Sequence, residues 1–538
     1  MSRIVIDPIT RIEGHLKIEV ELSGDTVVDA WSSGTLFRGI EPILKGRQPQ
    51  DAWLLTQRLC GVCTYVHAVT SVRCVENSGA ISIPTNARIL RNLLMGAQWV
   101  HDHPIHFYHL HGVDWVDVTS ALKANASATV TLAKSVSPNA PTIDFAATQT
   151  TLANSVKSGQ MGPFAGSYGD HPAYKLSPEE NLLLTAHYLL AIRQQTKAAK
   201  MHALFGAKNP HLQSLQAGGL TCKNELTAAR ITEFRTLLAD MRNFISTVYL
   251  PDVVLVATQY KDWAAIGGFS NYLAYGEFPQ TNVEPDSFLL PRGYLWNRDL
   301  SAVKDLNPGY IYEHVQHSWY DGTTPDHPSV GKTVPKLTTY DTADRYSWLK
   351  APRYGGEPME VGPLARVLVA YAKGVPAVKT AVDDVLKQTG LTVADLHSTL
   401  GRVAARAIET QVVADAMDGW LNQLQTGQPV ASTGTIPAKG MGMGLGEAPR
   451  GALGHWIDMV DGKINNYQMV VPSTWNLGPR CAAGKRGPVE QALVGTKVTD
   501  PARPIEILRI VHSYDPCLAC AVHVIDTRRD RDYTVRVG

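Results

Sequence analysis

The chain carries two Cys-x-x-Cys motifs, one near each end. Cys60 and Cys63 lie in RLCGVCTYVHAV, and Cys517 and Cys520 lie in DPCLACAVH. Two thiolates three positions apart can bind one metal ion, so the two motifs together offer four sulfur ligands. On this spacing alone, we expect either a structural zinc site or an iron–sulfur site.

The placement of the two motifs argues against a zinc site. Zinc ribbons keep their cysteine pairs within a short segment, whereas almost the whole chain separates the pairs here. A histidine also follows each motif, because His67 lies four residues after Cys63 and His523 lies three residues after Cys520. Histidines beside thiolates suit hydrogen bonds that tune a metal site. Spacing alone leaves open the alternative that both are ordinary core histidines.

Composition narrows the class of protein. The 538 residues include 50 Lys and Arg against 49 Asp and Glu, so no basic excess points to nucleic acid as a partner. The first residues lack the apolar segment of a secretory signal, and the longest apolar runs are too short for a transmembrane helix. Seven cysteines spread over this length do not form a disulfide framework. The three outside the motifs are expected to be small buried residues: Cys74, Cys222 and Cys481.

The chain begins with β-type sequence and continues with long helices. RIVIDP, LKIEVEL and VVDAW predict strands, with Gly24-Asp25 as a turn. Ser177 followed by Pro178 is a strong helix start, and that helix is expected to end near Gly206. Further helices are expected from a cap at Thr85 to Val100, from Glu225 to Leu250 before Pro251, from Pro363 to Gly390, and from Thr392 to Leu424.

The regions between these helices differ in composition. Residues 251–358 are rich in Pro, Gly, Tyr and Trp and predict an irregular insertion with short strands. Glycines at every second position from Gly440 to Gly446 are interpreted as a connection, since no strand–helix context supports a phosphate-binding loop. HWIDMVDGKINNYQMVV predicts a hairpin that turns at Asp461-Gly462. The expected fold class is α+β, mainly α, with a core of long bundled helices and small N-terminal and C-terminal β elements.

Six motifs in this order resemble one protein family. RIEGH, FRGIE, RLCGVCTYVH, EAPRGALGHW, VVPSTWNLGPR and DPCLACAVH together are similar to the large, catalytic subunit of a nickel–iron hydrogenase of the respiratory hydrogen-uptake type. The resemblance covers essentially the whole chain, and no position that the family assigns to the metals departs from its pattern. It implies the large-subunit fold and an oxidoreductase that cleaves H2 reversibly and heterolytically, with uptake as the expected direction.

The resemblance assigns all four motif cysteines to one nickel–iron centre. Cys60 and Cys517 match the terminal nickel ligands, and Cys63 and Cys520 match the ligands that bridge nickel and iron. The iron of the family also carries CO and CN ligands. Soft thiolates suit nickel, so the ligand set is chemically consistent with this assignment.

Other motif residues take roles around this centre by resemblance. Arg450 matches a residue over the open metal position, and whether Arg450 or Cys517 is the base stays open. Asp102 and Asp515 match acids that orient the arginine, and Glu13 matches the first proton carrier leading away from Cys517. Taken alone, Arg450 and Glu13 would be interpreted as solvated charges. Cofactor-binding positions are matched by Pro449, Ser473 and His67.

A second metal site is implied outside the cysteines. Glu41 in FRGIE, the backbone carbonyl of Met469 and His523 match a site for Mg2+ or Fe2+, and hard oxygen ligands suit magnesium. The stretch HDHPIHFYHLHG contains five histidines. The resemblance assigns this stretch to helix packing and gives only Asp102 a role in the site.

The resemblance also implies partners and a location. The chain has no further cysteine cluster for an electron relay, so an iron–sulfur small subunit is expected to form a heterodimer with it. That subunit would carry a twin-arginine export signal, which places the enzyme at the membrane on the periplasmic side; a cytoplasmic location is the alternative. A membrane cytochrome b, nickel-insertion proteins and a maturation endopeptidase are further expected partners, and nucleic acid is not.

The expected organisation is one multi-lobed catalytic subunit over residues 1–523. Its parts are an N-terminal β region with the first motif (1–83), a helical bundle (84–250), an irregular insertion (251–358), a second bundle segment (359–430), and a β-hairpin region with the second motif (431–523). The family's endopeptidase cuts after the histidine that matches His523. Residues 524–538 are therefore expected to be removed on maturation, and burying their many charges would be costly.

Three other functions stay open from the sequence. A quinone-site subunit of a respiratory complex shares this ancestry, but such relatives lack the cysteine pairs. A hydrogen sensor with low turnover would carry the same site residues, so only activity distinguishes it. A zinc-braced structural protein would contain zinc in place of nickel and iron.

Overall fold

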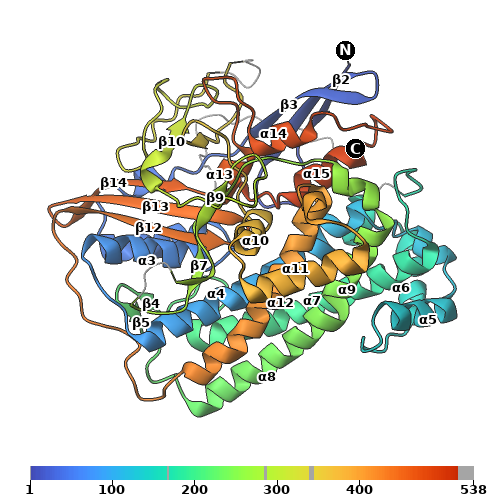
Figure 1. The fold of residues 1–538 in the computed structure, drawn as a ribbon, viewed down its shortest axis with the longest axis horizontal. Helices are drawn as coiled ribbons and strands as arrows, with labels where there is room; N and C mark the ends of the chain where they lie inside the picture. The colour runs from blue at the N-terminus through green and yellow to red at the C-terminus, as the bar shows by residue number, and fades with distance from the viewer. Residues whose placement is uncertain (1, 167–168, 284–286, 339–343, 519–538) are drawn as a thin grey trace.

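The structure is a computed structural model that describes all residues except 1, 167–168, 284–286, 339–343 and 519–538. Long helices form the larger part of the molecule, and the N-terminal strands and the last helices lie together at the opposite end (Figure 1). A large hydrophobic cluster extends from the N-terminal strands through the helices to Leu518. The main α character with minor β elements confirms the predicted fold class.

The predicted N-terminal strands are present and form a three-stranded antiparallel sheet. It consists of β1 (Ser2–Ile6), β2 (Leu16–Ser23) and β3 (Thr26–Gly34). Alternate side chains of β2 are buried, as expected for a strand with one face on the core. Residues 7–15, between β1 and β2, contain the RIEGH motif, in which residues 11–14 are half-buried and His15 is exposed.

Two helices form the centre of the bundle. α4 (Thr85–Ile105) and α12 (Thr399–Gln423) pack against each other, and most residues of both are buried. Figure 1 shows α7 and α8 running alongside them. The surrounding helices are α7 (Pro178–Gly206), α8 (Ala228–Phe244), α9 (Leu250–Gln259), α10 (Pro363–Ala372) and α11 (Pro376–Thr389).

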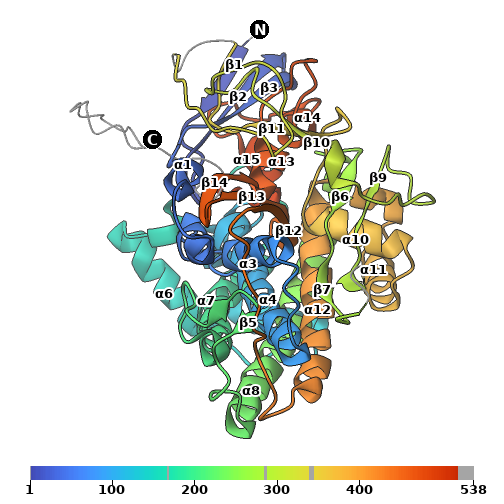
Figure 2. The same ribbon diagram turned by 90° about the vertical axis from the view of Figure 1, so that its left-hand side faces the viewer.

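Shorter elements complete the fold (Figure 2). The remaining helices are α1 (Ile40–Leu44), α2 (Ala52–Thr56), α3 (Val66–Ser78), α5 (Ala126–Val136), α6 (Phe145–Ser158), α13 (Pro472–Leu477), α14 (Pro488–Leu493) and α15 (Ile505–Ser513). Two-residue to four-residue strands pair in the middle of the chain: β4 (Leu215–Gln216) with β5 (Gly219–Leu220), β6 (Tyr272–Ala274) with β9 (Gly293–Leu295), β7 (Glu277–Pro279) with β8 (Phe288–Leu290), and β10 (Ile311–His314) with β11 (Ala351–Tyr354).

A second antiparallel sheet lies against α3. It consists of β12 (Gly440–Ala448), β13 (Gly451–Val460) and β14 (Lys463–Val470), and its last two strands confirm the hairpin predicted at Asp461-Gly462. The glycine-rich segment is a strand, so its interpretation as a connection was wrong. A Cβ on Gly442 would lie 2.2 Å from the Cys74 carbonyl oxygen, and one on Gly444 would lie 2.3 Å from that of Thr70. Alternate glycines occupy one face of the strand and let its backbone pack directly on α3.

Several predicted helix boundaries differ from the structure. α7 begins and ends as predicted, with a capping box at Ser177. Thr85 is the first helical residue of α4 and not its cap. The predicted stop before Pro251 was wrong, because a π-helical turn (Ile245–Tyr249) leads directly into α9 and the chain stays helical through Pro251.

Two predicted long helices are each divided. The segment from Pro363 forms α10 and α11, with Gly374 at positive φ between them. The segment from Thr392 forms a short 3-10 turn and then α12, which Ser398 caps. Among the described residues, no helix has both the length and the apolar character needed to cross a membrane.

Replacing Gly444 by alanine tests the contact between β12 and α3. The new methyl group would overlap backbone atoms of Thr70 and Cys74, so we expect a loss of roughly 1–3 kcal/mol in the free energy of unfolding, typical of overpacking. Gly419→Ala in α12 is the control, because a Cβ there meets nothing within 4 Å and alanine favours a helix. Thermal unfolding checks both variants, and a Gly444→Ala midpoint equal to that of the parent protein would contradict this packing.

Candidate metal centre

The segments that carry the RIEGH motif and the second cysteine motif are joined by backbone hydrogen bonds. Glu13 and Cys517 form a parallel β-bridge. The N–H of Glu13 donates to the Pro516 carbonyl oxygen at 3.2 Å, and the N–H of Leu518 donates to the Glu13 carbonyl oxygen at 2.7 Å. This bridge fixes Cys517 close to the start of the chain.

Three of the four motif cysteines converge at this point. The sulfur atoms of Cys60, Cys63 and Cys517 lie within 4.8 Å of one another, and all three residues are buried. Cys60 Sγ lies 3.5 Å from Cys517 Sγ, and none of the three forms a disulfide. The backbone N–H groups of Val62 and Cys63 both donate to Cys60 Sγ at 3.3 Å, an arrangement that favours a thiolate.

This geometry fits a soft metal ion. Several sulfur atoms that face one another in a buried pocket are a donor set for nickel, zinc or iron. Cys520 and His523 lie outside the described residues, so their predicted ligand roles stay predictions.

A buried arginine lies beside the cysteines. Arg450 occupies the two-residue turn between β12 and β13. Its Nε donates to the Asp515 carbonyl oxygen at 3.0 Å, and its Nη2 lies 3.0 Å from Asp515 Oδ1. Burial alone would lower the pKa of Arg450, but the charges of Asp515, Cys517, Cys63 and Asp102 raise it well above its ordinary value. Arg450 is therefore a permanent cation that can balance the charge of buried thiolates.

The two predicted acids hold Arg450 to different degrees. Asp515 makes both contacts described above, whereas Asp102 Oδ2 lies 4.0 Å from Arg450 Nη1. Asp102, in α4, accepts hydrogen bonds through Oδ1 from Gln98 at 2.6 Å and from His101 at 3.0 Å. Burial raises the pKa of Asp102, and His101 and Arg450 partly offset that rise. Asp515 is thus the main partner of the arginine.

Two residues with a predicted cofactor role, Ser473 and Pro449, are held by hydrogen bonds to neighbouring residues. The Ser473 hydroxyl accepts a hydrogen bond from the N–H of Cys517 at 2.9 Å. Pro449 is buried in the same turn as Arg450, and its carbonyl oxygen accepts from Arg366 Nη2 at 2.8 Å. Both residues are therefore fixed beside the cysteine pocket.

Glu13 makes a direct side-chain contact with Cys517. Cys517 Sγ donates to Glu13 Oε2 across 3.3 Å. A thiol and a carboxylate at this distance can exchange a proton without an intervening group. The role of Glu13 as the first proton carrier stays a prediction, and this contact is the geometry that it requires.

His67 begins a chain of hydrogen bonds that leads away from the cysteines. Its Nδ1 lies 3.1 Å from His455 Nε2, and His455 Nδ1 lies 2.8 Å from the Tyr467 hydroxyl. The Tyr467 hydroxyl donates to Ser71 Oγ at 2.9 Å. Burial lowers the pKa of His67 to about 4, although the charge of Cys60 opposes this, so His67 is neutral near pH 7. No sequence signal identified His455 or Tyr467 in this role.

The two described residues of the predicted magnesium site lie together. Glu41 Oε1 accepts the N–H of Met469 at 2.8 Å, and Glu41 Oε2 accepts the Thr333 hydroxyl. Gln468 Oε1 accepts from Thr333 at 3.3 Å and from Lys350 Nζ at 2.9 Å. Sequence reasoning missed the contact from Thr333, because that residue lies in the segment interpreted as an irregular insertion.

The remaining cysteines and the histidine-rich stretch behave as predicted structural residues. Cys74, Cys222 and Cys481 are buried, and none belongs to the metal-binding group found among the described residues. His103 lies 2.7 Å from Glu409, and His106 Nε2 lies 2.7 Å from the His512 carbonyl oxygen. These contacts tie α4 and its π-helical end (His106–His111) to α12 and α15.

Comparison with protein families gives a match over most of the chain. A family model described as nickel-dependent hydrogenase matches residues 38–523, and one described as HoxL-like matches residues 3–30. The uptake hydrogenase large subunit of Rhizobium leguminosarum is 44% identical, over 97% of this chain and 95% of that protein. The hydrogenase-2 large chain of Escherichia coli is 42% identical over 100% of both chains. The quinone-reactive Ni/Fe-hydrogenase large chain of Wolinella succinogenes is 42% identical, over 98% of this chain and 96% of that protein.

Solved structures show the same fold. The Ni-Fe-Se hydrogenase of Desulfovibrio vulgaris Hildenborough in the reduced state aligns with a TM-score of 0.82 and 34% identity, over 97% of this chain and 100% of that one. The reduced, active Ni-Fe-Se hydrogenase of Desulfomicrobium baculatum aligns with a TM-score of 0.81 at the same identity, over 97% of this chain and 100% of that chain.

Replacing Cys517 by alanine should lower bound metal to background, because it removes one of three converging sulfur atoms. Cys74→Ala is the matched control, since Cys74 is equally buried but donates only to the Gly442 carbonyl oxygen. It should keep the metal and lose about 1 kcal/mol of stability. Elemental analysis of the purified variants decides; metal loss in Cys74→Ala with retention in Cys517→Ala would reverse the assignment.

Proposed function

Since the chain belongs to the nickel-dependent hydrogenase family, we propose that it works as an H2-uptake enzyme whose nickel–iron centre is held by the four motif cysteines. Because it belongs to this family, the chain is a hydrogenase large subunit and an oxidoreductase that acts on H2. The observation that carries the proposal is the convergence of Cys60, Cys63 and Cys517 in a buried pocket beside Arg450.

The ligand roles follow the motifs. Cys60 and Cys517 would hold the nickel, and Cys63 and Cys520 would hold the nickel and the iron together. Pro449 and Ser473 would contact CN ligands on the iron, which also carries CO. Such a centre, when bound, would supply the metal at which H2 is cleaved heterolytically.

The protein side chains would then handle charge and protons. Arg450 stays protonated, so it shapes the electric field over the pocket, and Asp515 holds its guanidinium in place. The Cys517 sulfur is the nearer candidate for the base, because it already contacts Glu13 Oε2. Glu13 would receive the proton from Cys517 and pass it outward.

A second metal would be bound outside the cysteine cluster, between α1 and β14. Glu41, the Met469 carbonyl and His523 would bind Mg2+ or Fe2+, and the contact between Glu41 and the Met469 backbone supports this assignment. The hard carboxylate and carbonyl oxygens match such ions better than the cysteine pocket does. Its role would be structural, since it would join α1, β14 and the C-terminal segment.

The electrons would leave through a partner. The relatives are named as large subunits or large chains, which supports a heterodimer with an iron–sulfur small subunit. One relative is named quinone-reactive, which supports electron transfer through a membrane cytochrome b. We place the complex at the membrane, on the periplasmic side, exported with a twin-arginine small subunit.

Co-expression of the chain with its small subunit and maturation proteins tests the function. The purified complex should contain nickel and iron and reduce a dye with H2. Zinc in place of both metals would contradict the proposal, and nickel-loaded protein that binds H2 with almost no turnover would indicate a sensor.

Glu13→Gln tests the proton route. Glutamine has nearly the same shape but cannot carry a proton, so turnover and hydrogen–deuterium exchange should fall together by roughly a hundredfold or more, with nickel content retained. Glu21→Gln, on the N-terminal sheet, is the control and should match the parent enzyme. Unchanged exchange in Glu13→Gln would move the proton route elsewhere.

Removal of residues 524–538 is a further proposal, and these residues lie outside the described part of the chain. The intact mass of nickel-loaded, active enzyme should correspond to a chain that ends at His523. A mass that includes Gly538 in active enzyme would show that no processing is needed.

A further inference from the structure

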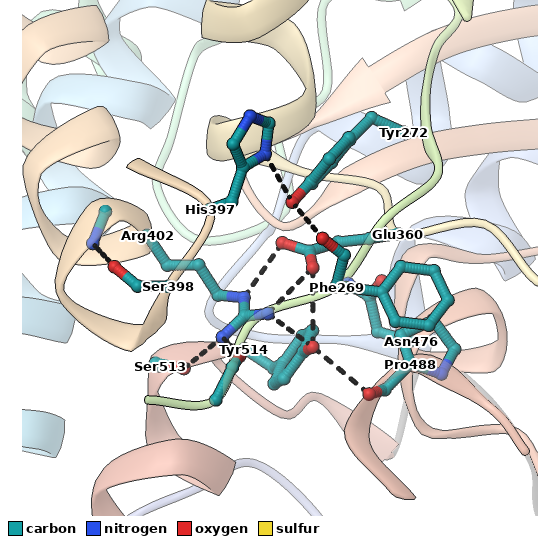
Figure 3. A network of polar contacts seen from close by, with 12 residues as sticks. Phe269, Tyr272, Glu360, His397, Ser398, Arg402, Asn476, Pro488, Ser513 and Tyr514 are labelled. Atoms are coloured by element: carbon teal, nitrogen blue, oxygen red, sulfur yellow. Dashed lines mark hydrogen bonds and ion pairs between the residues drawn. The ribbon is translucent and has the colours of Figure 1, made fainter. Parts of the chain in front are cut away.

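A buried arginine outside the cysteine cluster contacts Ser513 and Tyr514, which precede Cys517 in the chain. Arg402, in α12, uses all five N–H donors of its guanidinium group (Figure 3). Nε and Nη2 donate to the two carboxylate oxygens of Glu360, each at 2.8 Å. The other donors bond to the Gly267 carbonyl oxygen at 2.7 Å, the Tyr514 hydroxyl at 2.6 Å and Ser513 Oγ at 3.4 Å.

Glu360 is fixed through its backbone as well as its carboxylate. Its N–H donates to the Asn271 carbonyl oxygen at 2.9 Å, and its carbonyl oxygen accepts the N–H of Leu273 at 3.0 Å. Two residues later, a Cβ on Gly362 would lie 2.7 Å from the Arg450 carbonyl oxygen. The segment around Glu360 therefore touches both Arg402 and the turn that carries Arg450.

The other side of the network is the segment that leads from α15 to Cys517. The Tyr514 ring lies under the Arg402 guanidinium, with Cζ 3.9 Å from the ring centroid. The Tyr514 hydroxyl donates toward the Pro488 carbonyl oxygen and Glu360 Oε2, which lie 3.3 Å and 3.4 Å from the hydroxyl oxygen. One turn further along α12, Arg406 Nη1 donates to the Ser513 carbonyl oxygen at 2.7 Å.

This segment contains a backbone conformation that needs support. Asp515 has a φ of 53°, a left-handed conformation that costs a non-glycine residue energy, and it precedes Pro516, which restricts it further. Such conformations persist where the surroundings hold them firmly. Here Arg402 and Arg406 hold the residues before Asp515, and Arg450 holds its carbonyl oxygen.

We propose that Arg402, Glu360 and Tyr514 form a clamp that sets the direction in which the chain enters the metal centre. The clamp acts through Asp515 and Cys517, so its members are positioning residues. It fixes Asp515 against Arg450 and the Cys517 sulfur against that of Cys60. This role rests on the proposed function, since it concerns the geometry of the nickel ligand Cys517.

Tyr514→Phe tests the clamp with a minimal change, because it keeps the ring under the guanidinium and removes only the hydroxyl. We expect the assembled enzyme to retain its nickel, to show a shifted nickel electron paramagnetic resonance spectrum, and to lose about tenfold in turnover, since small displacements of reacting groups have large effects on rate. Tyr272→Phe is the matched control. The Tyr272 hydroxyl belongs to the same buried network but contacts Phe269 and His397 and not the segment before Cys517.

The two variants separate positioning from general stability. Both should lower the thermal unfolding midpoint by a similar amount, but Tyr272→Phe should keep the nickel spectrum and the turnover of the parent enzyme. A parent-like spectrum and turnover in Tyr514→Phe would overturn the clamp, and so would an equal spectral shift in Tyr272→Phe. The parent enzyme is measured in the same experiment. Absence of nickel from the parent enzyme would contradict the proposed function. A Tyr514→Phe spectrum that equals the parent spectrum would contradict the clamp alone.

Discussion

Glu13 and Cys517 join segments from near the two ends of the chain, through their backbones and through their side chains. A metal site made from cysteines at opposite ends of the chain exists only if both ends are held together in the interior. The backbone bridge at Glu13 provides this, and the Glu13 carboxylate then lies directly against the Cys517 sulfur. This contact thus joins two segments from near the ends of the chain and puts a carboxylate against a sulfur atom.

Charge balance explains the environment of this contact. Buried thiolates and carboxylates are stable only when cations lie close to them. Arg450 faces Asp515 and the cysteines, and Arg402 is paired with Glu360. Burial lowers the pKa of Arg406 to about 10, although the charge of Asp515 opposes this, so Arg406 remains charged near neutral pH. The arginines of α12 therefore both neutralise the interior and hold the segment that leads to Cys517.

The parts of the fold that local chemistry determines were predictable from the sequence. Ser177 and Pro178 fix the start of α7, and the two cysteine motifs predicted the convergence seen for Cys60, Cys63 and Cys517. The strand that contains Gly440 to Gly446 was not predicted. Its glycines are needed because the strand backbone packs directly on α3, and α3 is remote in sequence. The predicted helix stop before Pro251 was wrong, because the chain stays helical from the π-helical turn Ile245–Tyr249 through the proline. Arg402 and Thr333 were not found because their roles depend only on tertiary contacts.

We propose that sulfur atoms from both ends of the chain bind one nickel ion next to iron. X-ray absorption at the nickel edge of the assembled enzyme reports the identity of the nearest neighbours of the nickel. We expect a nearest shell made mainly of sulfur, with an iron atom just beyond it. A shell of nitrogen and oxygen, or a nickel spectrum that is unchanged in Cys517→Ala, would contradict it.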